Sequence, residues 1–340
     1  MTFTRIARAA AMIASVAICS YQTPVSAESW PQANAQSLGW SPEKLQAARG
    51  FSEKLRPTAV IVVQDGKVIA NWGDVSRKVN IASVRKSLLS ALFGIAIEDK
   101  KISLSSTLSE LVVDDLPPAL TEGEKQATVR DLMMARSGIY HRAAYETAEI
   151  RRTRPKRGSH SPGSFWFYNN WDFNALGSIY IKETGEDIFK SFARKIAAPI
   201  EMEDFSARDG SYARESVSDH PAYVFKMSAR DLARFGQVYL DHGTWRGKQV
   251  IPSAWVEEST TPLSSPTGHN SGYGYMWWTL RTDMWGQGGA FNAGYGGQVV
   301  AYIPGKRLVV VQTVDLRDNP RGIEMRDFFV FLKKLEAASP

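Results

Sequence analysis

Ser83 and Lys86 form a Ser-x-x-Lys pair near the start of the segment NIASVRKSLLSALFGIAI, which begins at Asn80. Residues three apart lie on one face of a helix, so the lysine amine can reach the serine hydroxyl. A serine hydroxyl is a weak nucleophile unless a base removes its proton. A lysine is such a base only when burial or another cation lowers its pKa. The pair therefore has the residue types of an activated nucleophile.

The spacing alone is weak evidence, because Ser41 and Lys44 have the same spacing. There the segment SPEK opens an amphipathic helix, and capping by Ser41 explains the pattern without chemistry. Ser83 can be explained in the same way, as an N-cap followed by a surface lysine. The segment LLSALFGIAI from Leu88 is apolar on nearly every face, however, which indicates a central helix and favours the nucleophile.

The elements around this helix predict one antiparallel sheet assembled from both ends of the chain. Strand patterns occupy residues 58–75, around Asp65-Gly66, and residues 296–315, around Pro304-Gly305. Amphipathic helices are expected at 41–55 and 321–338. Helical patterns and loops dominate from about 103 to 281. We predict an α/β (α+β) fold with an α/β part at 28–102 and 282–340, an inserted helical part at 103–281, and a ligand cleft between them.

The first 27 residues have the pattern of a secretory signal peptide. Two arginines precede the apolar run AAAMIASVAIC, and the small residues of VSA predict cleavage after Ala27. We expect an exported protein, periplasmic or secreted, without a stable membrane anchor. The single cysteine, Cys19, leaves with the peptide, so the mature chain is held by its core without a disulfide.

Composition indicates a folded domain, with 44% hydrophobic and 22% charged residues. Loss of Arg5 and Arg8 lowers the net charge from +6 to +4, which predicts no particular partner. The basic stretch RRTRPKRGSH from Arg151 is expected to be a solvated loop, not a nucleic-acid site. Composition therefore names no partner, and the oligomeric state stays open.

Further motifs follow in a characteristic order. The segment GSFWFYNNWDFNALG contains Tyr168 and Asn170 in a Tyr-x-Asn arrangement, and GGAFNAGYGGQVVAYIP supplies a glycine-rich approach to a strand. With TVRDLMMARSGI, MSARDLARFGQVYLDHG and GYGYMWW, these segments resemble the serine beta-lactamase and penicillin-binding-protein-like superfamily. The resemblance is to its class C beta-lactamase-related group, which includes esterases, D-amino-acid peptidases and 6-aminohexanoate-dimer hydrolases. The segments SGIYHRAAYE and RGSHSPGSFWFYNNWDFN resemble the last of these branches most.

The resemblance implies a role for each catalytic position. Ser83 would be the nucleophile, Lys86 its general base, and Tyr168 the proton relay that protonates the leaving group and later helps to activate water. Asn170 would hydrogen-bond the substrate or orient Lys86. The mechanism implied needs neither a metal nor a cofactor.

The third motif of this group, commonly Lys-Thr-Gly or His-x-Gly, is expected at Asn292-Ala293-Gly294. The oxyanion hole would then be the backbone N–H groups of Ser83 and Tyr295. In lactam-processing relatives a cation at the first position pairs with the substrate carboxylate, and Asn292 cannot supply that charge. We therefore expect a neutral ester or amide substrate, with a beta-lactamase or a D-amino-acid peptidase as the alternative.

The resemblance also places His141 and His160 at the edge of the cleft, and several tryptophans near the motifs are candidates to line it: Trp166, Trp171, Trp277, Trp278 and Trp285. Two other classes of function stay open. A non-catalytic binding protein could use the same fold, although the intact Ser83, Lys86 and Tyr168 oppose it. A Ser-His-Asp hydrolase would need another serine, and the sequence has no Gly-x-Ser-x-Gly segment to place one.

Overall fold

The computed structural model describes Thr2 and residues 30–266, 268 and 271–340. The predicted signal peptide, apart from Thr2, and its cleavage site lie outside the described residues. Among the described residues, no helix has the length and apolar character needed to cross a membrane.

A seven-stranded sheet organises the structure, in the order β2-β1-β12-β11-β10-β9-β8. Every neighbouring pair is antiparallel. Its strands are β1 (Ala59–Gln64), β2 (Lys67–Gly73), β8 (Gly272–Tyr273), β9 (Trp278–Thr279), β10 (Ala290–Gly294), β11 (Gln298–Ile303) and β12 (Leu308–Thr313). β1 from one end of the chain pairs with β12 from the other, so the predicted fold class is confirmed.

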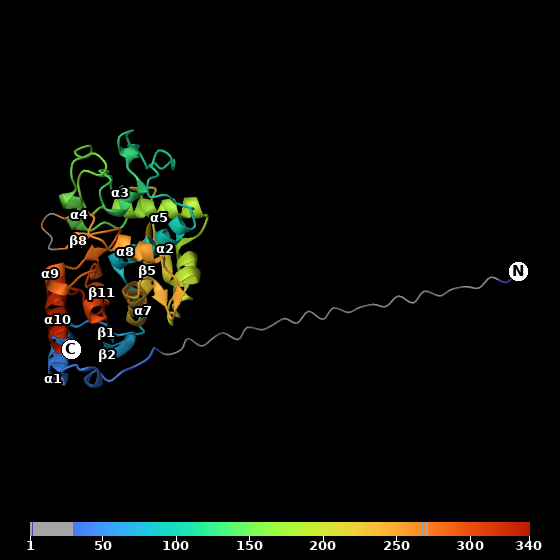
Figure 1. Ribbon diagram of the computed structural model, residues 1–340. Coiled ribbons are helices and arrows are strands. Elements are labelled where there is room, and N and C mark those ends of the chain that lie inside the picture. Colours follow the sequence, from blue (N-terminus) through green and yellow to red (C-terminus); the bar gives the residue numbers. More distant parts are fainter. Residues whose placement is uncertain (1, 3–29, 267, 269–270) are drawn as a thin grey trace.

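The sheet is covered on both faces, which explains its strand sequences. The strands β1, β11 and β12 are buried at every position and consist largely of valine and isoleucine. The helices α1 (Pro42–Leu55) and α10 (Met325–Ala338) pack together on one face, and α7 (Ala229–Leu240) packs on the other (Figure 1). A Cβ at Gly236 would lie 2.7 Å from the Val309 side chain, so glycine permits the close approach of α7 to the sheet.

The second part contains the central α2 (Arg85–Glu98) and further helices, several of which pack against it. They are α3 (Val129–Met133), α4 (Ala148–Thr153), α5 (Asn170–Thr184), α6 (Ile188–Phe192) with the π-helical turn Ala193–Ala197, and α8 (Ser253–Ser259). Short strands accompany them: β3 (Val79–Asn80), β4 (Gly210–Ala213), β5 (Ala222–Met227), β6 (Thr244–Trp245) and β7 (Lys248–Gln249). The remaining short helix α9 (Thr282–Trp285) precedes β10.

The division between the two parts differs from the predicted one. The expected helical segment, 103–281, contains α7, β8 and β9, which belong to the sheet and its cover. The helix α8, which follows α7 in the sequence, packs against α2, so no single boundary in the sequence separates the two parts. The sequence pattern gave no sign of this, because an amphipathic helix can cover either a sheet or other helices.

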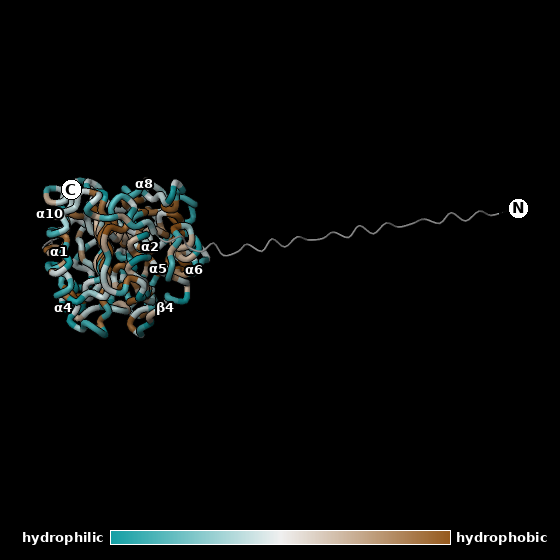
Figure 2. Tube along the Cα trace, turned by 90° about the horizontal axis from the view of Figure 1, so that it is seen from below, coloured by the Kyte–Doolittle hydropathy of each residue, from teal (hydrophilic) through white to brown (hydrophobic). Residues whose placement is uncertain are grey.

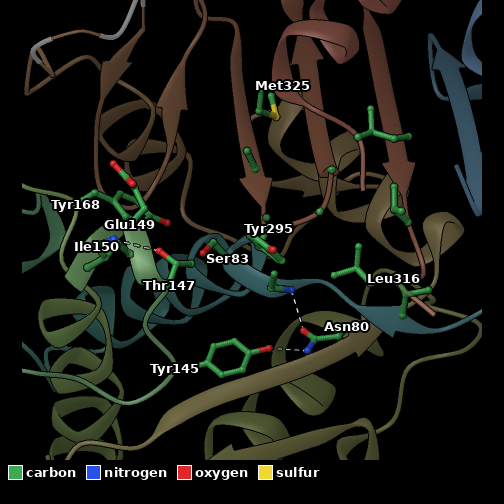
Figure 3. Close-up of a pocket in the computed structure, with 18 of the residues that line it drawn as sticks. Asn80, Ser83, Tyr145, Thr147, Glu149, Ile150, Tyr168, Tyr295, Leu316 and Met325 are labelled. Atoms are coloured by element: carbon green, nitrogen blue, oxygen red, sulfur yellow. Dashed lines mark hydrogen bonds between the residues drawn. The ribbon is translucent and has the colours of Figure 1, made fainter. Parts of the chain in front are cut away.

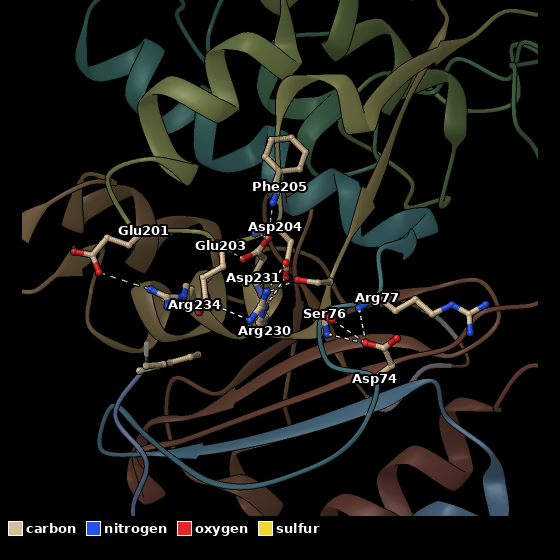
Figure 4. Close-up of polar contacts among 12 residues, drawn as sticks. Asp74, Ser76, Arg77, Glu201, Glu203, Asp204, Phe205, Arg230, Asp231 and Arg234 are labelled. Atoms are coloured by element: carbon tan, nitrogen blue, oxygen red, sulfur yellow. Dashed lines mark hydrogen bonds and ion pairs between the residues drawn. The ribbon is translucent and has the colours of Figure 1, made fainter. Parts of the chain in front are cut away.

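The buried Asp231 of α7 joins this helix to the preceding loop (Figure 4). Its carboxylate accepts the backbone N–H groups of Glu203, Asp204 and Phe205 at 2.7, 3.1 and 2.8 Å. Burial raises the pKa of Asp231 to about 6. The neighbouring Arg230 forms ion pairs with Asp204 and Glu203. These contacts fix the entry to α7 and so connect the helical part to the sheet.

The helix α2 is buried on almost all sides, as its apolar sequence predicts. Hydrophobic segments run through the middle of the molecule and hydrophilic ones along much of its outline (Figure 2). The serines of α2 are satisfied locally or by a neighbour: Ser87 Oγ donates to Val84 O at 3.0 Å and Ser90 Oγ to Tyr275 O at 2.8 Å. The two cations in the first turn, Arg85 and Lys86, are each only 1% exposed.

Candidate active site

Ser83 lies in the 3₁₀ turn Ala82–Val84, directly before α2. Its hydroxyl does not cap α2, whose N-cap is Val84 without a side-chain hydrogen bond. Ser41 Oγ, by contrast, accepts the N–H of Lys44 at 3.3 Å and caps α1. The two Ser-x-x-Lys pairs therefore differ in structure: Ser41 is a helix cap, and Ser83 is free for other contacts.

The backbone at Ser83 is held in an uncommon conformation. Ala82 has φ 47°, in the left-handed region, which costs a residue with a Cβ about 1–2 kcal/mol. Asn80 stabilises this turn, because its Oδ1 accepts the Ala82 N–H at 2.9 Å (Figure 3). Its Nδ2 donates to the Tyr145 hydroxyl at 2.6 Å. Asn80 thus links the turn of Ser83 to the loop that carries Tyr145.

Lys86 is the centre of a polar cluster inside an apolar environment. Its Nζ lies 3.0 Å from Ser83 Oγ, 2.6 Å from the Tyr168 hydroxyl and 3.0 Å from Asn170 Oδ1. The side chain comes from the first turn of α2, and its partners come from the turn before α2 and from the start of α5. The structure thus brings together four of the residues expected at the site.

Burial acts on the protonation of this cluster. It lowers the pKa of Lys86 well below 10.5, and the positive charge of Arg85 lowers it further. Burial also raises the pKa of Tyr168 to about 12. A neutral amine next to a neutral phenol is a proton acceptor next to a proton donor, which is the arrangement that general acid–base chemistry requires.

Asn169 and Asn170, at the start of α5, make different hydrogen bonds. Asn169 is the N-cap and accepts the N–H of Trp171 at 3.2 Å. Asn170 accepts from Lys86 and donates through Nδ2 to the Tyr145 carbonyl at 2.7 Å. Of the two roles considered for Asn170, these bonds favour orientation of Lys86.

Tyr145 is a supporting residue that the sequence did not reveal. Its φ is 67°, its carbonyl orients Asn170, and its hydroxyl accepts from Asn80. Its N–H donates to Glu215 Oε1 at 2.8 Å. All of these partners are distant in sequence, so no local pattern could identify it.

A cleft of about 1590 Å³ opens at Ser83 and is also lined by Tyr168, Asn170, Gly294 and Tyr295. Figure 3 shows Tyr295 beside Ser83. A Cβ at Gly294 would lie 2.3 Å from the Ile81 carbonyl oxygen, so only glycine lets the end of β10 approach the turn of Ser83 this closely. Tyr295 follows Gly294 and is 67% exposed. The expected third motif therefore lies against the nucleophile turn.

The expected substrate contact of Asn292 needs correction. Its side chain is 2% exposed, and Nδ2 donates to the Met276 carbonyl at 2.8 Å. Its neighbours Phe291 and Ala293 line the cleft instead. Alternate residues of a strand point to opposite faces, so Asn292 lies on the far side of β10. The wall that β10 presents to the cleft therefore carries no cation, because Phe291 and Ala293 form it.

Other expected neighbours of the cleft also lie elsewhere. His160 stacks on Phe165 with ring centroids 4.0 Å apart, His141 is 9% exposed, and neither lines the cleft. Of the five tryptophans considered, Trp278 lines it and stacks on Tyr168 at 5.9 Å. Within the described part of the chain, no group of three or more histidine, cysteine, aspartate or glutamate residues could hold a metal ion.

The sheet is built from both chain ends, and a Ser-x-x-Lys pair with a buried lysine stands at the start of the central helix. Together these features define a fold of the beta-lactamase and transpeptidase-like superfamily. The sequence model described as Beta-lactamase matches residues 44–330, and the chain belongs to this family.

Similar proteins agree with this family. A protein of Bacillus anthracis named for 6-aminohexanoate-dimer hydrolase has a TM-score of 0.70 at 19% identity, over 92% of this chain and 87% of its own. A penicillin-binding protein of Bacillus halodurans (TM-score 0.64, 14% identity, 85% and 99% coverage) and a class C beta-lactamase (0.63, 14%, 87% and 95%) share the fold. An uncharacterized protein of Alkalihalophilus pseudofirmus is 22% identical over 78% of this chain and 85% of its own.

Proposed function

We propose that the protein is a serine hydrolase that cleaves an ester or amide bond through an acyl-enzyme on Ser83. The observation that carries this proposal is the position of the Lys86 amine, which is buried and within hydrogen-bond distance of both Ser83 Oγ and the Tyr168 hydroxyl. A base that contacts the nucleophile, oriented by a third group, is the arrangement of an activated nucleophile. Asn170 is the orienting group here.

Acylation begins when the neutral Lys86 amine takes the proton of Ser83 and Oγ attacks the substrate carbonyl carbon. The backbone N–H groups of Ser83 and Tyr295 stabilise the oxyanion that forms. Tyr168 donates its proton to the leaving oxygen or nitrogen as the bond breaks, and the Lys86 ammonium returns a proton to Tyr168. In deacylation, water attacks the acyl carbon and loses its proton to the same pair, and Ser83 Oγ is released with a proton.

The β10 wall of the cleft favours a substrate that is neutral near the reacting bond, and the cations that line the cleft, Lys78, Lys226, Arg317 and Arg326, lie on other segments. The wall formed by β10 offers Phe291 and Ala293, which supply neither a cation nor a hydroxyl for a carboxylate. The missing charge-assisted hydrogen bond is worth about 1.5–3 kcal/mol, which corresponds to roughly a tenfold to hundredfold lower kcat/KM. We propose ester hydrolysis first, and amide hydrolysis on short linear substrates second.

Substrate choice is a direct test. We expect kcat/KM for p-nitrophenyl acetate to exceed that for a chromogenic cephalosporin by at least about tenfold, since the cephalosporin carboxylate finds no cation on the β10 wall. Both substrates are measured on one preparation, with the Ser83→Ala variant as the blank. A cephalosporin that is hydrolysed faster than the ester would contradict the neutral-substrate proposal and favour a beta-lactamase.

We also propose that the protein acts outside the cytoplasm, after removal of residues 1–27. This proposal rests on the N-terminal sequence alone.

A further inference from the structure

The cleft has two chemically different arms on either side of Ser83. One arm, here the apolar arm, is lined by Phe291, Ala293, Leu316, Ile323, Met325 and Phe329, and the charged residues Asp315, Arg317 and Arg326 line the cleft beside them. The other is lined by polar side chains that include Asn80, Thr147, Glu149, Glu215 and Lys226. In Figure 3 Leu316 and Met325 lie on one side of Ser83, and Thr147 and Glu149 lie on the other.

The apolar arm is a packed structure formed by three elements. Phe291 of β10 packs against Phe329 of α10 with ring centroids 5.3 Å apart. The loop between β12 and α10 closes its base, because the Ile323 N–H donates to the Gly296 carbonyl at 3.1 Å. A Cβ at Gly296 would lie 2.6 Å from the Leu316 side chain, so the base is already filled. Because Leu316, Met325 and Phe329 are only half-buried, a ligand can cover them.

We infer that the apolar arm binds an unbranched apolar chain of the substrate, so that the preferred substrates are esters or amides with an aliphatic segment and a polar or charged far end. This inference rests on the proposed function. Burial of apolar surface supplies the selectivity, since each buried methylene raises kcat/KM by up to about fourfold. The polar arm is suited to hydrated groups because it contains both carboxylates and an amine.

Chain-length series test the inference. We expect kcat/KM to rise from acetyl to octanoyl in a series of p-nitrophenyl esters, or from ethyl to octyl in a series of acetate esters, by up to about fourfold per methylene. Met325→Glu puts a carboxylate into the apolar arm at the first residue of α10, where a helix tolerates an acid. Its loss of kcat/KM should grow with chain length and reach about tenfold for the octyl chain.

The matched control is Val330→Glu, an exposed apolar position of the same helix outside the cleft, which should leave both series unchanged. If neither series improves with length, or if Met325→Glu lowers all substrates equally, the inference is wrong. Labelling of Ser83 by a fluorophosphonate separates this outcome from failure of the proposed function, because the label reports the nucleophile and not the arm.

A second, independent observation concerns Arg85, a buried cation without a carboxylate partner. Its Nη2 donates to Asn174 Oδ1 at 3.2 Å, and within the described residues Nε and Nη1 have no hydrogen-bond partner. The guanidinium lies 4.3 Å from the centroid of the Tyr223 ring and 5.9 Å from that of Tyr145. Buried charges are normally paired, so an unpaired arginine at this position requires a reason.

We relate the unpaired charge of Arg85 to its neighbour Lys86. Arg85 and Lys86 each reach a neutral amide of α5, and these amides, Asn174 and Asn170, are four residues apart on one helix. Phenol rings pack around the two cations: Tyr145, and Tyr223 of β5, lie against Arg85, Tyr168 lies against Lys86, and Tyr273 of β8 packs on Tyr168. The buried carboxyl of α5, Asp172, accepts from Ser137 and Asn169 instead. Burial raises the pKa of Asp172 and of the phenols of Tyr168, Tyr223 and Tyr273, which disfavours a negative charge on each of them.

We propose that Arg85 is a positioning residue whose unpaired charge keeps the neighbouring Lys86 amine unprotonated. Its charge is effective because no carboxylate among the described residues forms an ion pair with it and because the surroundings exclude water. An isosteric change can supply the missing carboxylate without touching the substrate or Lys86: Asn174→Asp. The negative charge would pair with Arg85, cancel its repulsion of the Lys86 ammonium and so raise the pKa of Lys86.

The test is the pH dependence of kcat/KM for a short neutral ester. The rising limb should move to higher pH by about one unit in Asn174→Asp and in Arg85→Met, while Arg85→Lys, which keeps the charge, should stay near the parent. Thermal unfolding of each variant separates this effect from the stability lost with the bond from Asn174 Nδ2 to the Ala144 carbonyl. An unmoved limb in Asn174→Asp contradicts the role of Arg85. An active Ser83→Ala enzyme would instead contradict the proposed function.

Discussion

Ser83→Ala is expected to lower kcat by about three to six orders of magnitude while the protein stays folded. The loss is large because the variant has no oxygen to form the acyl-enzyme, and the remaining groups cannot replace a covalent route. The fold should persist because Ser83 Oγ caps no helix and its side-chain contacts, with Lys86 and Tyr168, lie at the cleft. Ester hydrolysis and thermal unfolding measured on the same sample check both parts.

The matched control is Ser41→Ala, which removes the cap of α1. It should cost about 1 kcal/mol of stability and leave kcat unchanged, the reverse of the pattern at Ser83. Mass spectrometry after treatment with a fluorophosphonate should find the adduct on the tryptic peptide from Val79 to Arg85. An adduct on another serine, or turnover by Ser83→Ala, would refute the mechanism.

Lys86→Arg should be almost as inactive, with a loss of about three orders of magnitude or more. A guanidinium cannot accept the proton of Ser83, although it keeps N–H donors for Tyr168 and Asn170. Lys44→Arg, in the other Ser-x-x-Lys pair, should have no effect, because Lys44 contributes only its backbone N–H to the Ser41 cap. If Lys86→Arg and Lys44→Arg had the same effect on activity, Lys86 would not be the catalytic base.

The pH profile gives the sign of the Lys86 effect. The base must be the neutral amine, so kcat/KM should rise with pH and level off above the pKa of Lys86, well below 10.5. The acid is the neutral Tyr168, whose pKa is about 12, so no falling limb is expected below that pH. A profile that falls with pH between neutrality and 10 would show that the protonated amine is the active form.

The prediction of the fold from sequence was largely sound, and that of the site was partly so. Strand patterns at both chain ends, with glycine at the Asp65-Gly66 turn, are local signals, and the observed β1 and β2 lie where they were expected. The helix after Ser83 was predicted as central because its residues are apolar on every face. The expected helical segment also contained α7, which covers the sheet, since α7 is amphipathic and its pattern does not say what it covers.

The site shows the same division between local and non-local information. Ser83 and Lys86 are three residues apart, so their contact follows from helix geometry alone. Asn292 was assigned to the cleft from its place in a motif, but the face that a strand residue occupies depends on the register of the whole sheet. Asn80 and Tyr145 could not be predicted at all, because they support Ser83 and Asn170 only through contacts across the fold.

The sequence by itself determined the chemical groups available and the pairs that one helix or one hairpin brings together, because such geometry needs only a few consecutive backbone angles. Tertiary structure decided what surrounds those groups. Lys86 is buried beside Tyr168 because α2 packs against the segment before α5. Arg85 contacts the amide of Asn174, whereas a carboxylate would have neutralised its charge. Asn292 points away from the cleft. The pKa of an amine and the face of a side chain depend on desolvation and register, and both arise only when distant segments pack together.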